Sequence, residues 1–598
     1  MGNLIDSQMS YTVSDLISNA TKRNWNKLSI SSDKKELSSG ANKRFSKKTI
    51  IPKENFDTSN NIQQVQILIE KIKASAYDID DVLFSLGVNL LKSRKAITEN
   101  IDNLRNEYKL LEIDEFIKYK LPDETDILGI VYQCIQTEGE KNIKGSYYTP
   151  KQVALNMVVD VKLKETDKVF DPCCGSSMFL TNIPNINPEQ IFGVDIDPIA
   201  VLVSKFNFYA KFPDTKITPK IYRADFIAAP SLLDIRTDDF QQTILDNTFD
   251  YIITNPPWGG VSGDVLMSPY SKIIQSGEVF SYFLIKSFDY LNDNGILRFL
   301  LPCSILNVRL HKDIREFLIE KTNLTEIKLH PGAFAGVMTQ YISIETKKEQ
   351  EISDKITVID EKDKYKIDKK TIKGNSNYII SAINDTDKQI IDIVNKKKKY
   401  TLENSIWALG IVTGDNKNKL KAKHQVCYEP IYTGKEITPF CLKKATKYVM
   451  YDRKNFQQVA KDEIYRAESK LVYKFISKKL VFSIDNSGSL FLNSANILIP
   501  NIPNMSIYSV AAFLNSELYQ YLYMKMFGEI KILKGSLSQL PFAEITSEQD
   551  KRLSAEVSKI VENNLGNYSS LQDYIYNIFE ITQNQIDHIK EVLYGNTN

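Results

Sequence analysis

The chain has few of the residues on which metal centres and disulfide frameworks are built. Its 598 residues include six cysteines and four histidines. The cysteines, at positions 134, 173, 174, 303, 427 and 441, show no repeated C-x-x-C spacing. Because zinc sites and disulfide-rich folds need paired cysteines or histidines, we expect neither a metal centre nor a disulfide framework.

Long apolar runs are also missing. No stretch approaches the roughly 18 apolar residues of a membrane-spanning helix, and the polar start MGNLIDSQMS has no signal-peptide pattern. Hydrophobic residues make up 42% of the chain and charged residues 25%, which is typical of a globular protein. We therefore expect a cytoplasmic protein without membrane contact, and at this length about three or four domains.

The first part of the chain predicts helices. Residues 1–55 are polar and lysine-rich, and the stretch TVSDLISNATKRNWNKL loosely resembles the start of a helix-turn-helix. An ordinary helical surface is the alternative interpretation of that stretch. Residues 56–140 repeat apolar residues at intervals of three and four, as in IQQVQILIEKIKASAYDIDDVLFSLGVNLL, and form the predicted helical N-terminal region.

Residues 141–350 have the pattern of an α/β domain. Short apolar runs (KVFD, QIFGVDID, FDYIITN and ILRFLLP) alternate with helix-like stretches such as PKQVALNMVVDVKL and VFSYFLIKSFDYLN. This alternation predicts βαβ units and a mostly parallel, doubly wound sheet. In such sheets ligands bind at the carboxyl ends of the strands, so residues that follow the apolar runs are the candidates for a site.

The remainder of the chain predicts three further segments. We expect a charged connector at 351–400, an α+β domain at 401–545 with short β-like runs and turns, and a helical tail at 546–598. Residues 415–479 hold sixteen Lys or Arg against seven Asp or Glu, with Tyr and Phe interleaved. Such a region is either a nucleic-acid footprint or a solvated lysine-rich surface, and both interpretations stay open here.

Two of four motifs in the α/β domain precede a predicted helix. In KGSYYTP, residues 144–150, we expect Thr149 to cap a helix whose first residue is Pro150. In VFDPCCGSSMFL, residues 169–180, a strand and an acidic residue are followed by a turn of small residues that opens a helix. Such a turn lets backbone amides approach a bound ligand closely.

The third motif adds acidic residues after two further strands. In IFGVDIDP, residues 191–198, Asp195 is placed to accept hydrogen bonds from both hydroxyls of a ribose, and we expect Asp197 to cap the next helix. Asp225, in YRADF, is placed to bind the exocyclic amine of a nucleobase.

The fourth motif, FDYIITNPPWGG, is a buried strand that must stop at Asn255, because prolines cannot continue a central strand. An amide and a large aromatic side chain are then held on a stiff turn at the strand end. The chain has no G-x-G-x-x-G fingerprint and no G-K-[ST] P-loop, which argues against dinucleotides and nucleoside triphosphates. An adenosine-like cofactor without a pyrophosphate, S-adenosylmethionine, fits what remains.

The series GSYYTP, DPCCGSSMFL, GVDIDP, ADF and NPPW resembles the gamma class of amino-group DNA methyltransferases, the TaqI-like adenine methyltransferases. The resemblance covers residues 120–345 strongly and 400–595 more diffusely, where GIVTGDN, IYTGKEITPF, FLNSELYQYLY and KGSLSQLPF resemble a target-recognition domain. It implies a Rossmann-like methyltransferase core, a helical N-terminal region and an α+β specificity domain. Ser177 departs from the family pattern, which usually has glycine there, and we expect serine to be tolerated.

The resemblance also implies roles for individual residues. The Asn255 side chain and the Pro256 carbonyl would accept the two amino hydrogens of an adenine flipped out of double-stranded DNA, and Pro257 would stiffen the turn. Trp258 would stack on the base and Phe334, in GAFAGVMTQYISIE, would close its other face, unless it is an ordinary core residue. Cys173 and Cys174 need no catalytic role and are interpreted as packing residues. The implied cofactor-binding residues are Tyr148, Thr149, Pro150, Asp171, Pro172, Cys173, Gly175, Asp195, Ile196, Asp225, Phe226 and Asn255.

Several alternatives stay open at this point. Related Asn-Pro-Pro motifs serve enzymes that methylate glutamine or RNA, although asparagine as the first residue favours adenine over cytosine. Glu107-Tyr108-Lys109 formally fits an E-x-K nuclease half-motif, with Asp80 and Asp81 upstream, but LRNEYKLLEIDEF predicts a helix rather than a strand. The chain could also be the modification subunit of a larger complex, or a DNA-binding relative without activity. A separate cognate restriction endonuclease is an expected partner.

Overall fold

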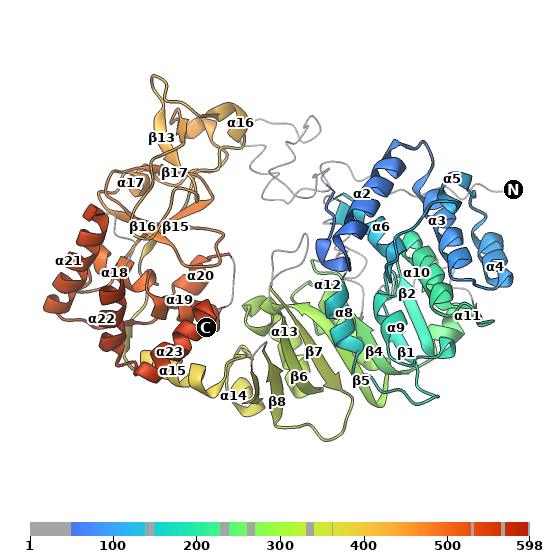
Figure 1. Ribbon diagram of the computed structural model, residues 1–598. Helices are drawn as coiled ribbons and strands as arrows, with labels where there is room; N and C mark the ends of the chain where they lie inside the picture. Colours follow the sequence, from blue (N-terminus) through green and yellow to red (C-terminus); the bar gives the residue numbers. More distant parts are fainter. Residues whose placement is uncertain are drawn as a thin grey trace. The chain divides into compact units, whose positions relative to one another are not determined.

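The computed structural model describes residues 49–137, 140–141, 149–227, 238–259, 269–330, 340–360, 363–527, 531–563 and 568–595. The described residues belong to two compact units, which we call the N-terminal unit (49–381) and the C-terminal unit (382–595) (Figure 1). The helix-turn-helix-like stretch lies outside the described residues.

A sheet of nine strands, in the order β3-β2-β1-β4-β5-β7-β6-β8-β9, forms the centre of the N-terminal unit. The first five of these strands run parallel to their neighbours, and β7 is antiparallel to both β5 and β6. The prediction of a mostly parallel α/β sheet is confirmed. In sheet order the strands are β3 (Lys220–Arg223), β2 (Ile191–Asp195), β1 (Val169–Asp171), β4 (Phe249–Thr254), β5 (Leu291–Pro302), β7 (Tyr341–Lys347), β6 (Asn323–His330), β8 (Lys355–Ile359) and β9 (Lys364–Asp368).

Apolar runs make the central strands because both faces of the sheet are covered by other elements. All three residues of β1 are buried. Helices contact strands of the sheet: α9 (Met178–Asn182), α10 (Pro198–Lys211), α12 (Val279–Asp289) and α13 (Lys312–Glu320). Helix α8 (Lys151–Val158), which precedes β1, packs on α9. The segment predicted as a charged connector contributes β8 and β9 to the sheet, followed by α14 (Lys369–Lys373) and α15 (Asp385–Lys396).

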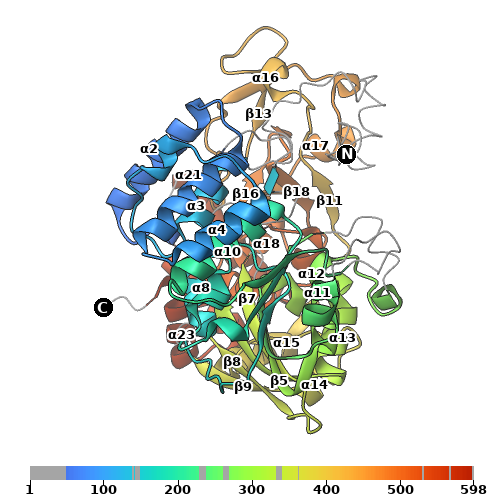
Figure 2. The same ribbon diagram turned by 90° about the vertical axis from the view of Figure 1, so that its right-hand side faces the viewer.

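The predicted N-terminal helices pack directly onto the α/β part of the unit. Their hydrophobic core continues without a break from Val65 to residues of the sheet and of α10, and Figure 2 shows α3 beside α10. At this contact a Cβ on Gly87 would lie 2.4 Å from the ring of Phe206, so glycine is required there. The helices are α2 (Ser59–Ala74), α3 (Ile79–Ser93), α4 (Thr98–Tyr108), α5 (Asp114–Ile117) and α6 (Ile127–Ile135).

The C-terminal unit combines two four-stranded sheets with a helical part, as the mixed and helical patterns predict. One sheet has the order β11-β18-β15-β16 and the other β12-β14-β13-β17. The strands are β11 (Ile406–Leu409), β12 (Leu420–Lys421), β13 (Glu429–Tyr432), β14 (Lys447–Val449), β15 (Lys470–Lys474), β16 (Phe482–Asp485), β17 (Leu490–Phe491) and β18 (Ala495–Ile499), besides the pair β10 (Lys398–Tyr400) and β19 (Phe542–Ala543). The longer helices are α18 (Ile507–Leu514), α19 (Glu517–Met526), α21 (Ser547–Asn563), α22 (Ser569–Phe579) and α23 (Gln583–Tyr594).

Within the part of the chain that the structure describes, no helix has the length and apolar character needed to cross a membrane.

Candidate active site

The loop after β1 turns through two residues with left-handed backbone. It leads from Asp171 to α9 through Gly175 and Ser177, whose φ angles are 54° and 65°. Glycine adopts such angles freely, and serine does so with more strain. Ser177 adopts the left-handed conformation at this turn, and its hydroxyl contacts that of Ser204; its tolerance there stays a prediction.

Asp171 is a buried carboxylate at the start of this loop. Its Oδ1 accepts hydrogen bonds from the Cys173 amide at 3.1 Å and the Thr254 hydroxyl at 2.6 Å. Its Oδ2 is buried and has no hydrogen-bond donor among the described residues. Burial raises the pKa of Asp171 to about 7, because a charged carboxylate is poorly solvated there. The geometry suits a carboxylate that meets a cationic ligand group.

The two cysteines of the loop pack against neighbouring strands. The side chain of Cys174 is buried against Gly193 of β2, where an added Cβ would lie 3.1 Å from its sulfur. The sulfur of Cys173 lies 2.9 Å from Oγ1 of Thr254. Burial raises the pKa of both thiols well above the usual value, so both stay protonated at neutral pH. This agrees with their interpretation as packing residues.

Asp195 connects the loop after β1 with the loop after β2. Its Oδ2 accepts from the Gly175 amide and its Oδ1 from the Asp197 amide, both at 2.8 Å. Asp197 caps α10 as predicted, since its Oδ1 accepts from the Ile199 amide at 3.0 Å. Ile196 lies between the two acids and is 64% exposed. The roles of Asp195 and Ile196 toward a cofactor stay predictions.

The motif after β4 lies against the first motif of the chain. β4 ends at Thr254, as predicted, and the side chain of Asn255 follows it. Asn255 Nδ2 donates to Oγ1 of Thr149 at 3.1 Å, although 106 residues separate them in sequence. Pro256 is buried, Pro257 is half-buried, and half-buried Trp258 packs against the main core of the unit. The first, second and fourth motifs therefore meet at one end of the sheet.

The start of α8 differs from the prediction. Pro150, not Thr149, is the capping residue, and it has no side-chain group that can cap. The first amide of the helix, that of Lys151, donates instead to Oδ1 of Asn55 at 3.1 Å. Asn55, directly before the helical N-terminal region, thus supplies the cap, and the hydroxyl of Thr149 contacts Asn255.

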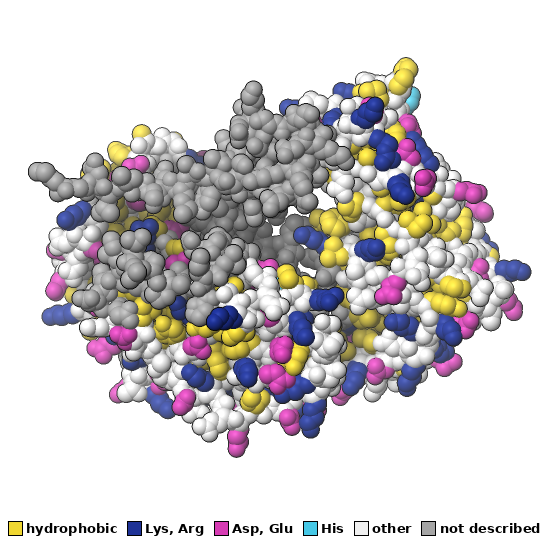
Figure 3. All heavy atoms as spheres, turned by 180° about the vertical axis from the view of Figure 1, so that it is seen from behind, with side chains coloured by type: hydrophobic (Ala, Val, Ile, Leu, Met, Phe, Trp, Pro, Cys, Tyr) yellow, Lys and Arg dark blue, Asp and Glu magenta, His cyan; other side chains and the backbone are white. Residues whose placement is uncertain are grey.

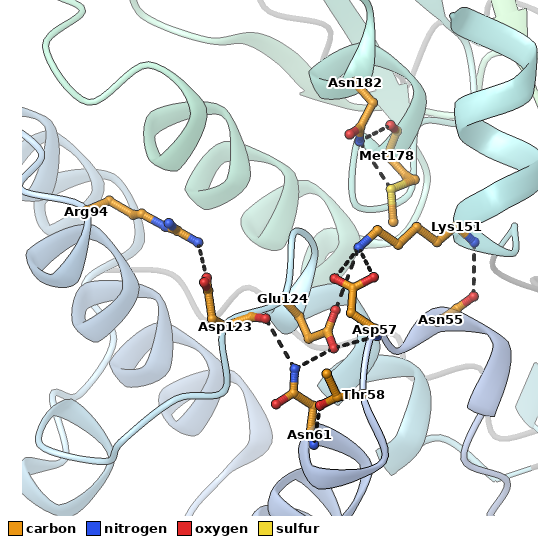
Figure 4. A network of polar contacts seen from close by, with 10 residues as sticks. All are labelled: Asn55, Asp57, Thr58, Asn61, Arg94, Asp123, Glu124, Lys151, Met178 and Asn182. Carbon is orange, nitrogen blue, oxygen red and sulfur yellow. Dashed lines mark hydrogen bonds and ion pairs between the residues drawn. The ribbon is translucent and has the colours of Figure 1, made fainter.

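A partly exposed ion-pair network lies beside this contact (Figure 4). Lys151 Nζ lies 2.7 and 2.6 Å from the two carboxylate oxygens of Asp57 and 3.8 Å from Glu124. Glu124 has a fully buried side chain, and its Oε1 accepts from the Asp57 amide and from Asn61 Nδ2. The hydrogen bond and charge of Lys151 lower the pKa of Asp57. These contacts fasten the first turn of α8 to the helical region.

The remaining predicted site residues are placed less directly. Asp225 accepts from the Ile227 amide at 3.0 Å, and the ring of Phe226 is buried against the rings of Phe170 and Phe283. Pro172 is buried beside Asp171. Tyr148 and Phe334 lie outside the described residues. Among the residues that are described, no group of three or more His, Cys, Asp or Glu side chains could hold a metal ion.

The E-x-K half-motif lies at the end of a helix, as its sequence predicts. Glu107 and Tyr108 are the last residues of α4, and Lys109 follows with a left-handed φ of 52°. Glu107 pairs with Lys205 of α10 at 2.5 Å, a contact that joins the helical region to the α/β part. Asp80 and Asp81 lie in the first turn of α3.

Sequence reasoning missed the residues N-terminal to the α/β domain that hold the motifs. Asn55 accepts from the Lys151 amide, which directly follows the first motif. Asp126 accepts from Ser176 of the second motif, and Tyr132 donates to Asp197 of the third. A signal existed for Asp126, because an acidic residue directly before the apolar run ILGIVYQCI is typical of a helix cap. Its tertiary partner, Ser176, lies 50 residues away and has no local signature.

Two known families match this chain. Residues 123–405 match the N-6 DNA methylase family, and residues 429–542 match the TaqI-like C-terminal specificity domain. The first match includes all four motifs, and the second includes strands β13 to β18 of the C-terminal unit.

Individual relatives agree with these matches. The type II methyltransferase M.VspI of Vibrio sp. (strain 343) is 24% identical over 416 residues, which are 62% of this chain and 98% of that protein. The methylase subunit of the type I restriction enzyme EcoEI of Escherichia coli is 26% identical over 285 residues, 44% of this chain and 52% of the subunit. The type IIL restriction-modification enzyme MmeI, solved with DNA, shares the fold with a TM-score of 0.53 and 13% identity over 90% of this chain and 96% of that one. The four motifs therefore lie in an N-6 DNA methylase domain, and a TaqI-like C-terminal specificity domain follows it in the chain.

Proposed function

We propose that this methyltransferase transfers the methyl group of S-adenosylmethionine to N6 of a flipped adenine in one short double-stranded DNA motif. The observation that carries the proposal is the contact of Asn255 with Thr149, beside the loop that starts at Asp171. This contact places the Asn255 amide, which can bind an adenine amino group, beside the loops that can bind an adenosine-like cofactor. The proposed setting is the cytoplasm, where such an enzyme meets DNA.

The residues present fit the cofactor. Asp171 Oδ2 is a buried acceptor without a donor among the described residues, and it suits the ammonium group of the methionine part. The turn at Gly175 would admit the cofactor close to backbone, and Asp195 would bind its ribose. When bound, S-adenosylmethionine supplies a methyl group on a positively charged sulfur, which can be transferred directly.

Asn255 would then act on the target base. Its amide plane is oriented because Nδ2 donates to Thr149. The Asn255 side chain and the Pro256 carbonyl would accept the two amino hydrogens of adenine and shift the lone pair of N6 toward the methyl group. Trp258, and Phe334 beyond the described residues, would hold the flipped base by stacking, worth about 1–3 kcal/mol for each base.

The C-terminal unit would read the DNA sequence. The family match at 429–542 and the lysines of the same region support recognition within this chain, without a separate specificity subunit. The names of the relatives support a role in restriction–modification, with a cognate endonuclease as partner. The helical position of the E-x-K half-motif gives no support to a nuclease in residues 49–137.

Methylation-sensitive long-read sequencing of DNA from expressing cells tests the proposal. We expect modified adenine at one short motif with the wild-type protein and none with Asn255→Ala, while the variant keeps nearly wild-type affinity for S-adenosylmethionine. Asn292→Ala is the matched control, because Asn292 is a half-buried asparagine at the start of β5, at the opposite end of the sheet. Absence of modified adenine with the wild-type protein would overturn the proposal, and RNA would be the next substrate examined.

A further inference from the structure

Helix α6 contacts both loops that form the cofactor side of the site. Its capping residue is Asp126, whose Oδ2 accepts a hydrogen bond from the hydroxyl of Ser176, in the loop after β1. Further along the helix, the hydroxyl of Tyr132 donates to Oδ2 of Asp197, after β2, at 2.7 Å. One helix from outside the α/β part thus spans the two loops.

The carboxylate of Asp126 is buried and accepts hydrogen bonds from three donors. Its Oδ1 accepts from the Gly129 amide at 3.1 Å and from Asn207 Nδ2 at 2.7 Å. Asn207, on α10, also donates to the carbonyl of Ser176 at 2.9 Å. Ser176 is therefore held at its hydroxyl by Asp126 and at its carbonyl by Asn207. Buried networks of this kind are costly to leave partly satisfied.

Ser176 lies at the centre of the turn after β1. It lies between Gly175 and Ser177, which both have positive φ. The amide of Gly175 donates to Asp195, so the turn also sets the position of the loop after β2. Backbone in sparsely populated conformations persists only where the surroundings enforce it, and Asp126 supplies part of that enforcement.

The sequence of α6 makes room for this arrangement. A Cβ on Gly129 would lie 2.3 Å from a carboxylate oxygen of Asp126. Glycine inside a helix costs about 1 kcal/mol relative to alanine. The helix therefore carries a less favourable residue at the one position that lets the capping carboxylate turn toward the loop.

We propose that α6 is a clamp that sets the positions of the two cofactor loops, with Asp126 and Tyr132 as its positioning residues. The inference rests on the proposed function, because these loops are the S-adenosylmethionine side of that site. Neither residue contacts Asn255, so loss of the clamp weakens cofactor binding more than it slows transfer at saturating cofactor.

The test compares Asp126→Ala and Tyr132→Phe with the full-length wild-type protein. Calorimetry gives the Kd for S-adenosylmethionine, hydrogen exchange of the cofactor-free protein gives the protection of the loop around Ser176, and initial rates give kcat and KM. We expect Kd to rise roughly tenfold or more for Asp126→Ala and roughly threefold for Tyr132→Phe, as for hydrogen bonds to charged and partly exposed groups. We expect faster exchange in the loop and kcat within about threefold of wild type.

Three further variants separate positioning from general stability. Asp126→Asn keeps an oxygen for the Gly129 and Asn207 donors and can donate to Ser176, so we expect it to restore most of the affinity that alanine loses. Asp368→Ala removes an exposed helix cap away from the loops, that of α14, and Tyr378→Phe removes a hydroxyl that donates to Glu320 at 3.2 Å. We expect both controls to bind the cofactor as the wild type does.

Wild-type affinity and loop protection in both clamp variants would overturn the inference, as would equal weakening in the two controls. If Asp126→Ala does not fold, Tyr132→Phe and Ser176→Ala decide the matter. If the wild-type protein itself binds no S-adenosylmethionine, the proposed function fails, and the exchange rates of the loop alone then decide whether α6 holds it.

Discussion

Two buried carboxylates, Asp485 and Asp171, one in each unit, differ in whether the protein places a cation and hydrogen-bond donors beside both oxygens. Asp485 ends β16 with its Oδ2 2.5 Å from the ammonium group of Lys470, and both side chains are buried. It also accepts hydrogen bonds from the Ser487 and Ser489 amides and from the Ser489 hydroxyl. Asp171 ends β1 just as deeply buried, but its Oδ2 has neither a donor nor a cation among the described residues.

The difference is the one expected between a carboxylate with a structural role and the ligand-binding carboxylate that we propose Asp171 to be. A buried charge is tolerable when the protein itself supplies the opposite charge and the hydrogen bonds, as it does for Asp485. Asp171 lacks that compensation, and its raised pKa is the result. Groups of this second kind gather at functional sites, where a ligand completes their surroundings.

The largest expected effect comes from neutralising Asp171. Asp171→Asn keeps the oxygen that accepts from Cys173 and Thr254 but loses the charge that would meet the cofactor ammonium. We expect the affinity for S-adenosylmethionine to fall roughly 10- to 100-fold, the range for a charge-assisted hydrogen bond. Calorimetry of the variant beside the wild type measures this, and unchanged affinity would refute a contact between Asp171 and the cofactor.

The same substitution should make the folded protein more stable. Because the pKa of Asp171 is raised from 3.8 to about 7 on folding, its ionisation opposes folding increasingly above pH 3.8 and to the full extent above pH 7. The gain in free energy of unfolding should therefore be largest above pH 7 and shrink as the pH falls toward 3.8, the pKa of Asp171 in the unfolded chain.

Lys470→Ala is the counterpart in the C-terminal unit. It leaves Asp485 buried and unpaired and should cost about 3–5 kcal/mol without changing cofactor affinity, as urea unfolding and calorimetry would measure.

The second expected effect is a pH dependence of cofactor binding. An ammonium group binds the ionised form of Asp171, and below pH 7 that carboxylate is mostly protonated in the free protein. The affinity for S-adenosylmethionine should therefore be about tenfold lower one unit below this pKa than well above it. Asp171→Asn should abolish that dependence. An unchanged dependence in the variant would assign the titration to another group.

The sequence predicts the parts of the site whose chemistry is local. Strand ends, the turn at Gly175 and the cap at Asp197 follow from residues within one motif, and the structure confirms them. The contact of Thr149 with Asn255 needed the fold, because nothing near Thr149 indicates its partner. The incorrect cap at α8 has the same cause, since the true acceptor, Asn55, lies 96 residues earlier.

The same reasoning explains what the sequence could not give in the rest of the chain. Strands β8 and β9 lie in a charged segment. The alternation of apolar residues there, as in KITVI, extends over too few residues to indicate the edge of a larger sheet. In the C-terminal unit the strands are short, so their pairing depends on contacts far apart in sequence, such as the parallel pairing of β13 with β17.

The smallest expected effect concerns charges that are exposed rather than buried. Lys443, Lys444 and Lys447 are exposed beside β14, and Figure 3 shows Lys and Arg side chains over the end of the C-terminal unit that carries β13 and α16 (Asn416–Lys419). The loop that carries them is fastened, because the Lys443 amide donates to the Glu436 carbonyl at 2.8 Å. Such lysines suit DNA phosphates, which contribute affinity but no sequence information.

Reversing Lys443 and Lys444 to glutamate should weaken DNA binding several-fold while leaving the methylated motif unchanged. A plot of log affinity against log salt has a negative slope, and each phosphate contact that is lost reduces its magnitude by about 0.9. The magnitude of the slope should therefore decrease by about 1–2 in the double variant. Fluorescence anisotropy over a salt series measures it, with Lys551→Glu and Lys590→Glu on the exposed surfaces of α21 and α23 as matched reversals. If the controls weaken DNA binding equally, the lysines beside β14 act through net charge alone. Their position would then not matter for DNA binding, in contrast to the position of Asp171 for cofactor binding. If the salt slope changes only with the β14 lysines, the position of a charge determines binding in both units. Burial of the charge would then be needed only at Asp171, where the proposed ligand group is a single ammonium.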